Sequence, residues 1–260
     1  PENFWGEIAN DIFWFKKPTK ILNKSKSPFY KWFEDGVTNT CYNALDLHID
    51  NGLGDKIALI YDSPITGAKS KYTYSQLREK VSKFAWTLRN QGINKGDRVI
   101  IYMPMIPEAV IAMLACSRIG AIHSVVFGGF ASNELANRIE DSKAKILITA
   151  SCGFEPGRTI EYKPLVDKAI EISKHKPNKT ILYQRSGHEV KLNGKNEISW
   201  DEALNGATEI DCVEMNANEL AYILYTSGTT GTPKGIVRDI GGHIVALKWT
   251  MKNIYNIDQN

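Results

Sequence analysis

A loop rich in glycine and hydroxyl side chains runs from Tyr225 to Gly235, with the sequence YTSGTTGTPKG. Gly228 and Gly231 carry no Cβ, so their backbone can take positive φ and approach a ligand closely. Successive backbone N–H groups in such a turn form a concave anion site. Hydroxyl donors and one cation complete the loop: Thr226, Ser227, Thr229, Thr230 and Lys234. This set of donors fits a polyphosphate.

The spacing differs from the phosphate-loop motif G-x-x-x-x-G-K-[ST]. Counting from Gly228, Pro233 stands where that motif has its second glycine, and Gly235 follows Lys234. A flexible linker is the plain alternative. However, an apolar run over 220–225 leads into the loop and Pro-Lys-Gly closes it, which is unusual for a linker. We therefore predict a phosphate-binding loop that follows a strand.

The segment Glu155-Pro156-Gly157-Arg158 carries one arginine, whose guanidinium fork suits a phosphate group. Taken without further context, a single loop arginine is more often a surface salt-bridge partner. A further candidate is Gly128-Gly129, which follows a predicted strand. These glycines either let a ligand lie close to the backbone or simply make the strand-to-helix turn, and the sequence leaves both open.

Histidines and cysteines give weaker signals. We interpret His123 and His243 as structural. The four cysteines are widely spaced and form neither a CxxC pair nor a Cys/His metal pattern, so we predict buried free thiols, a reducing compartment and no metal site. They are Cys41, Cys116, Cys152 and Cys212.

The elements that must position these residues alternate along the chain. Thr73 and Gln76 form a capping box that opens a helix, which Gly92 ends. A helix also starts at Pro107 and stops at Gly120. Further segments read as strands at 56–61, 98–103, 122–127, 145–149, 180–183 and 220–226, and as helices at 132–142 and 165–173. Such alternation predicts an α/β fold with a mostly parallel sheet flanked by helices on both faces.

Two regions fall outside this pattern. Residues 1–50 are rich in aromatic side chains and predict short helices and loops packed on a larger body. Residues 184–218 are polar and are predicted to be an irregular surface excursion. The 260 residues carry a net charge of +3, which is too balanced to indicate nucleic acid or a membrane surface, and no apolar run is long enough for a membrane span.

The loop YTSGTTGTPKG resembles the signature of the adenylate-forming superfamily, which includes acyl-CoA synthetases, luciferases and peptide-synthetase adenylation domains. Segments 39–46, 102–107, 126–130 and 238–243 resemble its acetyl- and propionyl-CoA synthetase branch, and Asp62-Ser-Pro64 and 155–158 its propionyl-CoA synthetase group. The resemblance implies an aromatic N-terminal segment over 1–50 and the first part of an AMP-binding adenylation domain over 51–260. It also implies that the chain forms part of the large N-terminal domain of an adenylate-forming enzyme.

The resemblance also implies the activity. A short carboxylic acid, propionate or acetate, attacks the α-phosphate of ATP with Mg²⁺ assistance, and coenzyme A then displaces AMP. Lys234 would act in catalysis, and the ATP phosphates would be held by Thr226, Ser227, Gly228, Thr229, Thr230, Gly231 and Lys234. Coenzyme A would be held by Glu155, Pro156, Gly157, Arg158, Gly128 and Gly129. Related acetyl-CoA synthetases carry an arginine where this chain has Glu155, so a two-arginine clamp is in doubt.

Several parts of the implied active site have no counterpart in this sequence, including the ribose-binding aspartate, the acyl pocket and the lysine-bearing C-terminal domain. We therefore expect an N-terminal portion of a longer protein, inactive by itself, with small-molecule partners and an open choice between cytoplasm and mitochondrial matrix. The alternatives are a non-catalytic phosphate- or coenzyme A-binding domain and another adenylate-forming enzyme. Acyl preference and oligomeric state are not determined by the sequence.

Overall fold

The central element of the fold is a seven-stranded sheet with the strand order β12-β11-β8-β6-β7-β14-β15. The computed structural model describes residues 1–226 and 233–257. Every neighbouring pair in the sheet is parallel except β14 and β15, which are antiparallel. The strand bounds are β6 Arg98–Met103, β7 Ile122–Phe127, β8 Ile146–Ala150, β11 Lys179–Tyr183, β12 Glu197–Ser199, β14 Leu220–Thr226 and β15 Lys234–Asp239.

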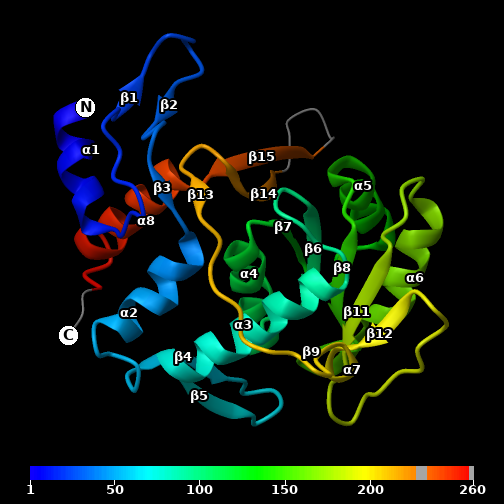
Figure 1. Cartoon of the computed structure of the whole chain (residues 1–260). Helices are drawn as coiled ribbons and strands as arrows, with labels where there is room; N and C mark the ends of the chain where they lie inside the picture. The colour runs from blue at the N-terminus through cyan, green and yellow to red at the C-terminus, as the bar shows by residue number, and fades with distance from the viewer. Residues whose placement is uncertain (227–232, 258–260) are drawn as a thin grey trace.

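Helices cover both faces of this sheet (Figure 1), which confirms the predicted fold class. On one face, α3, α4 and α7 pack on alternate side chains of β6 and β8, such as Ile101 and Ile148. On the other, α5 and α6 pack on the intervening side chains, such as Ile100 and Leu147. The helix bounds are α3 Tyr74–Asn90, α4 Pro107–Ile119, α5 Ser132–Ser142, α6 Tyr162–Ile172, α7 Trp200–Ala203 and α8 Gly241–Asn253. Strands buried on both faces explain the continuous apolar runs of the sequence.

Local signals account for several boundaries. Thr73 accepts a hydrogen bond from the Gln76 backbone N–H, and the Gln76 side chain accepts one from the Thr73 N–H, so the predicted capping box is present. Pro107 stands in the first turn of α4, and Gly120 ends that helix with φ of 72°. That left-handed conformation has little steric cost for glycine, which has no Cβ.

The aromatic N-terminal segment packs as short elements against the C-terminal helix α8. Trp5 lies edge-to-face with Trp249 of α8, with ring centroids 6.3 Å apart. Figure 1 shows α1 in blue beside α8 in red. The elements here are α1 Glu2–Ile8, η1 Ala9–Asp11, β1 Leu22–Asn23, β2 Lys31–Trp32, β3 Val37–Thr38, η2 Tyr42–Asp46 and α2 Leu47–Asp50.

In the described part of the chain, four short antiparallel pairs lie outside the main sheet, namely β1 with β2, β4 with β5, β9 with β10, and β13 with β3. The predicted strand at 56–61 exists as β4, but it pairs with the unpredicted β5 rather than joining the parallel sheet. The turn between them is closed by the Gly67 N–H, which donates to the Ser63 carbonyl at 2.8 Å. Their bounds are β4 Ile57–Asp62, β5 Lys69–Thr73, β9 Cys152–Glu155, β10 Arg158–Glu161 and β13 Met215–Asn216.

The prediction of an irregular excursion over 184–218 is wrong in part. β12 adds a parallel edge strand there, and α7 follows it directly. Ser199 and Glu202 form a capping box at the start of α7, and Trp200 stacks on Phe84 of α3 with ring centroids 3.8 Å apart. The capping-box spacing was visible in the sequence. The long-range stacking that holds so short a helix in place was not.

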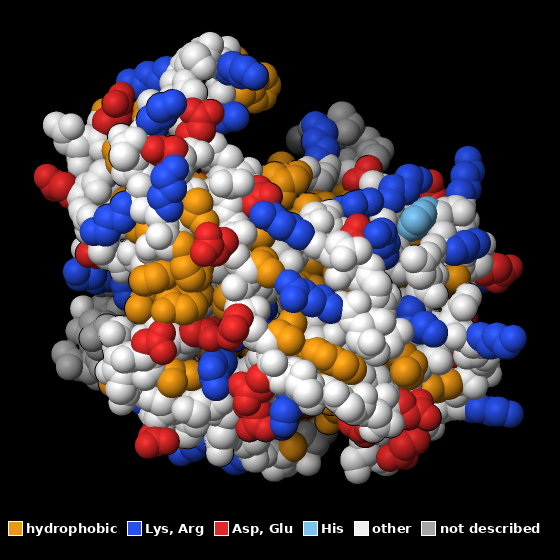
Figure 2. Space-filling model, in the orientation of Figure 1, with side chains coloured by type: hydrophobic (Ala, Val, Ile, Leu, Met, Phe, Trp, Pro, Cys, Tyr) orange, Lys and Arg blue, Asp and Glu red, His pale blue; other side chains and the backbone are white. Residues whose placement is uncertain are grey.

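Acidic and basic side chains are intermixed on the face drawn in Figure 2. Within the described part of the chain, no helix is long and apolar enough to cross a membrane.

Candidate functional site

The predicted binding segments follow the carboxyl ends of neighbouring parallel strands. Gly128 follows β7, the loop after Thr226 follows β14, and the β9–β10 hairpin follows β8. These strands run in the same direction, so their carboxyl ends meet at one edge of the sheet. Ligands of open α/β sheets bind outside this edge. The fold therefore gathers segments that are far apart in sequence into one candidate site.

The predicted phosphate loop connects β14 to β15. Thr226 and Lys234 are cross-strand partners at the end of the hairpin next to the loop, and both are exposed. Five of the predicted phosphate-binding residues lie outside the described residues: Ser227, Gly228, Thr229, Thr230 and Gly231. Lys234, which was expected within the loop, is the first residue of β15. A hydroxyl group and an ammonium group therefore flank the loop at its two ends.

Tyr225 attaches the base of this hairpin to α5. Its hydroxyl donates to Asp141 Oδ2 at 2.6 Å, and the Arg138 guanidinium lies over its ring, 5.3 Å from the centroid. Burial and the bond to Asp141 raise the pKa of Tyr225 above its usual range, so the phenol stays protonated and keeps donating. The sequence separation of 84 residues left no local signal for this contact.

The turn after β7 needs glycine for structural reasons at both positions. A Cβ at Gly128 would lie 2.2 Å from the Tyr162 hydroxyl oxygen and 3.0 Å from the Met103 carbonyl oxygen. Gly129 has φ of 99°. The strand-to-helix turn is thus sufficient to explain both glycines, and a coenzyme A contact stays a prediction.

The predicted coenzyme A segment is the tight turn of the β9–β10 hairpin rather than a free loop. Glu155 ends β9, Arg158 begins β10, and Gly157 between them has φ of 75°. Arg158 donates through Nε to Glu155 Oε2 at 2.7 Å, and its Nη2 lies 2.6 Å from the same oxygen. Arg158 therefore has a salt-bridge partner only three residues away, as expected if it is an ordinary surface arginine.

This hairpin lies against the Gly128-Gly129 turn. A Cβ at Gly153 of β9 would approach the Tyr162 hydroxyl to 2.6 Å, the same oxygen that limits Gly128, and a Cβ at Gly129 would lie 3.7 Å from Ile160 of β10. Tyr162 is buried between them. The structure thus brings the two glycine positions and the hairpin together. Tyr162 was not singled out in the sequence, because its partners lie on separate strands.

The two histidines flank the ring of Tyr222. His123 is buried, its ring centroid lies 5.5 Å from that of Tyr222, and burial lowers its pKa to about 4. The Tyr222 hydroxyl and His243 Nε2 are hydrogen-bonded at 2.6 Å, and burial also lowers the pKa of His243. Both rings are therefore neutral near pH 7; His123 is buried and His243 is half-buried.

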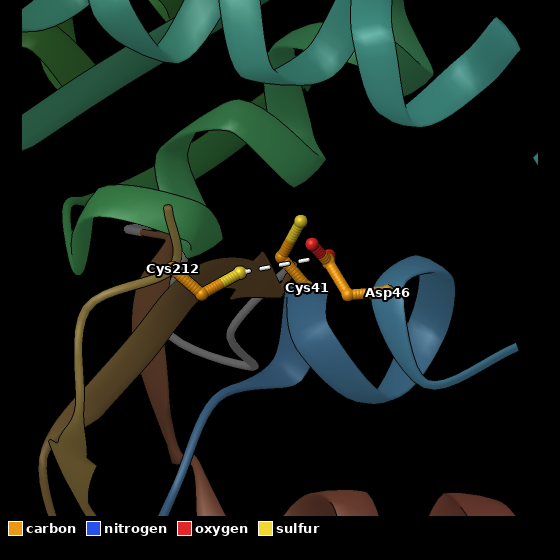
Figure 3. A group of neighbouring side chains, drawn as sticks. All are labelled: Cys41, Asp46 and Cys212. Atoms are coloured by element: carbon orange, nitrogen blue, oxygen red, sulfur yellow. Dashed lines mark hydrogen bonds between the residues drawn. The ribbon is translucent and has the colours of Figure 1, made fainter. Parts of the chain in front are cut away.

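The cysteines are free thiols, as predicted, and Cys212 is half-buried while the other three are buried. The structure nevertheless makes a cluster that the sequence did not reveal. Sulfur atoms of Cys41 and Cys212 and a carboxylate oxygen of Asp46 lie within 4.8 Å of one another, as Figure 3 shows. The two cysteines come from opposite ends of the chain, so sequence spacing gave no sign of it.

Arg118 of α4 occupies the centre of this cluster. Its Nη1 donates to Asp46 Oδ2 at 2.7 Å and to Cys212 Sγ at 3.1 Å, and its Nη2 donates to Asp46 Oδ1 at 2.9 Å. The guanidinium already supplies the positive charge that a metal ion would bring. The group is thus a poor cation site.

Comparison with known proteins identifies the class. The family described as "AMP-binding enzyme" matches residues 48–259, and the family "Acetyl-coenzyme A synthetase N-terminus" matches residues 1–44. The chain belongs to the AMP-binding enzyme family, which confirms the resemblance found in the sequence.

Individual relatives agree with this membership. The human "Acyl-CoA synthetase short-chain family member 3, mitochondrial" is 53% identical over 99% of this chain, which covers 38% of that protein. The "Acetyl-coenzyme A synthetase" of Streptomyces coelicolor is 43% identical over 98% of this chain, which covers 39% of that protein. In fold, "Acetoacetyl-CoA Synthetase from Streptomyces lividans" is similar over 98% of this chain and 39% of its own, with a TM-score of 0.88 and 24% identity. The chain thus spans well under half the length of these relatives.

Proposed function

We propose that the complete protein is an AMP-forming short-chain acyl-CoA synthetase. In the first half-reaction, a carboxylate oxygen of propionate or acetate attacks the α-phosphorus of ATP and the bond to the bridging oxygen breaks, which releases pyrophosphate. In the second, the thiol sulfur of coenzyme A attacks the acyl carbonyl carbon and AMP leaves. The observation that carries this proposal is the β14–β15 hairpin. Its loop is flanked by Thr226 and Lys234 at the carboxyl edge of the main sheet, and this part of the chain matches the AMP-binding enzyme family.

Lys234 is proposed to stabilise the leaving pyrophosphate. Its ammonium group stands at the end of the loop, exposed to solvent, and charge accumulates on the β- and γ-phosphates as the acid attacks. Thr226 adds a hydroxyl donor opposite. The Tyr225–Asp141 hydrogen bond and the stacked Arg138 fix the hairpin base on α5, so these donors approach the nucleotide from a supported position.

Mg²⁺ is proposed to arrive with ATP rather than to occupy a preformed protein site. Mg²⁺ in such enzymes is bound through substrate phosphates and one or two carboxylates, and it keeps several waters. At the described base of the hairpin, the nearby carboxylate of Asp141 already accepts the Tyr225 hydroxyl. The residues described there thus fit a Mg²⁺ ion that is bound mainly by the ATP phosphates and would neutralise their charge. They do not form a complete set of protein ligands for the ion.

Arg158 is proposed to bind a phosphate of coenzyme A, beside the Gly128-Gly129 turn and the Glu155-Pro156-Gly157 turn. Its guanidinium is exposed and engages Glu155 through one edge. A phosphate must therefore share or replace this carboxylate. An exposed pair of this kind contributes little free energy, so a dianionic phosphate can compete with it.

The test uses the complete gene product and measures acyl-CoA and AMP formation. Lys234→Ala is expected to slow adenylate formation, measured as ATP–pyrophosphate exchange, by about 100-fold, with Lys234→Arg recovering part of the rate. Lys248→Ala on α8 is the matched control and leaves the exchange unchanged. Wild-type exchange in Lys234→Ala would contradict the assigned role. Binding of ATP or coenzyme A without turnover by the complete protein would favour the non-catalytic alternative.

Arg158→Ala is expected to raise the KM for coenzyme A about tenfold or more while ATP–pyrophosphate exchange persists. Glu155→Gln is expected to lower that KM, because it removes the carboxylate that competes for the guanidinium. Lys168→Ala, an exposed cation of α6, is the control. A KM that is unchanged in both variants rules out coenzyme A binding at this hairpin.

The acid and the compartment are the finer parts of the proposal. The resemblance of 155–158 and Asp62-Ser-Pro64 to the propionyl-CoA synthetase group favours propionate, and kcat/KM compared for acetate, propionate and butyrate tests this. Relatives from human and Dictyostelium discoideum are named mitochondrial, which favours the mitochondrial matrix over the cytoplasm. Fractionation of cells that express the complete protein distinguishes the two.

A further inference from the structure

The backbones on either side of the Cys41–Cys212 pair are tied together by a buried asparagine. Asn39 Nδ2 donates to the Val213 carbonyl at 2.9 Å, and Asn39 Oδ1 accepts the Cys41 N–H at 2.8 Å. The Val213 N–H in turn donates to the Arg118 carbonyl at 2.9 Å. Because one side chain holds both segments, the two sulfurs stay within 4.8 Å of each other without a covalent bond.

The charges around the sulfurs favour sulfur chemistry over metal binding. Arg118 Nη1 lies 3.1 Å from Cys212 Sγ and 3.5 Å from Cys41 Sγ, so one cation can stabilise a thiolate on either residue. Asp46 accepts hydrogen bonds from both terminal nitrogens of the Arg118 guanidinium, and a weak one from the Cys212 thiol at 3.7 Å. The dashed line between Cys212 and Asp46 in Figure 3 marks that last contact.

We propose that Cys41 and Cys212 are a modification site that closes to a reversible intramolecular disulfide when the protein meets a hydroperoxide. To form a disulfide, the two sulfurs must close from within 4.8 Å to the S–S bond length of about 2.05 Å. Cys212 lies between α7 and β13, in a segment without helix or strand, which can make that approach. The cross-link would join the N-terminal aromatic segment to the body of the fold.

The chemistry balances with hydrogen peroxide as the oxidant. One sulfur, as a thiolate beside Arg118, attacks a peroxide oxygen, the O–O bond breaks, and a sulfenic acid and hydroxide form. The second sulfur then attacks the first, the S–O bond breaks, and the departing hydroxyl leaves as water with the second thiol proton. Two thiols and one peroxide thus give one disulfide and two waters. A small oxidant suits a site in which Cys41 is fully buried.

The pKa of Cys212 is raised, first by its hydrogen bond with Cys41 and then by burial. Two thiolates side by side would repel each other, so the pair holds at most one thiolate at a time. One sulfur can then act as the thiolate that the first step uses, and the other keeps the proton that leaves with water in the second step.

The experiment treats the protein with hydrogen peroxide, blocks the remaining thiols by alkylation, and analyses a non-reduced digest by mass spectrometry. We expect one peptide pair that joins Cys41 to Cys212, and its loss on treatment with dithiothreitol. The double variant Cys116→Ser/Cys152→Ser is the matched control and keeps the cross-link. Cys212→Ser and, independently, Cys41→Ala abolish it.

Thermal unfolding gives a second measurement. A disulfide that closes so long a loop restricts the unfolded chain, so the oxidised wild type is expected to unfold at a higher Tm than the reduced protein, whereas the oxidised Cys212→Ser variant is not. The proposal is overturned if peroxide leaves both thiols alkylatable, stops at sulfinic acid on either cysteine, or joins either residue to another cysteine. These measurements do not depend on synthetase activity.

Discussion

The buried imidazole of His123 makes stability depend on pH in a predictable direction. Its folded pKa is depressed from 6.5 to about 4 because burial disfavours the charged form. Its Nδ1 has no hydrogen-bond partner among the described residues. The unfolded ring therefore binds a proton more readily than the folded ring as the pH falls below 6.5. The stabilising contribution of the neutral ring is present above pH 6.5 and is lost as the pH falls toward 4.

The magnitude follows from the two pKa values. Each pKa unit corresponds to about 1.4 kcal/mol, so the full loss over the shift from 6.5 to about 4 is about 3.5 kcal/mol. At about pH 5 most of the unfolded rings are protonated and most of the folded rings are neutral, so the loss there is about 2 kcal/mol. This is a large part of the few kcal/mol that hold a domain together.

Urea unfolding followed by tryptophan fluorescence at about pH 7.5 and about pH 5 measures this loss. Other titrating groups also contribute, so the test compares slopes. We expect His123→Leu to lose about 2 kcal/mol less than the wild type between these pH values. The control His188→Gln removes a histidine near the surface, 3.6 Å from Glu161, and keeps the steeper dependence. Equal slopes in the wild type and His123→Leu would refute the reasoning.

Two further substitutions test packing. Asp46→Ala leaves the Arg118 guanidinium buried without its carboxylate, and we expect a loss of about 3–5 kcal/mol in the free energy of unfolding. Glu79→Ala, which breaks an ion pair with both partners exposed, should change it little; equal losses would contradict a buried-charge penalty. Gly128→Ala should cost about 1–3 kcal/mol because its Cβ would meet the Tyr162 hydroxyl at 2.2 Å, and Tyr162→Phe in the same chain should restore part of it, whereas additive costs in denaturant titrations would show that the hydroxyl is not the obstacle.

Residues 155–158, the predicted coenzyme A segment, had a role that the sequence could only partly define. The sequence placed Arg158 in a turn and left its role open between a salt bridge and a ligand. Glu155 lies three residues away, so a pairing was within reach of the sequence. The antiparallel register of the folded hairpin places Glu155 opposite Arg158 and so establishes the salt bridge, while coenzyme A binding stays a prediction.

The sequence by itself determined the alternation of helices and strands, the capping box of α3 and the glycine stop of α4. These are set by hydrogen bonds and side-chain periodicities that span only a few residues, so they can be recognised along the chain. Tertiary structure decided that β4 leaves the main sheet, that Tyr225 anchors the hairpin on Asp141, and that Cys41 meets Cys212 around Arg118. Each of these contacts joins segments distant in sequence, and packing of the folded chain brings them together.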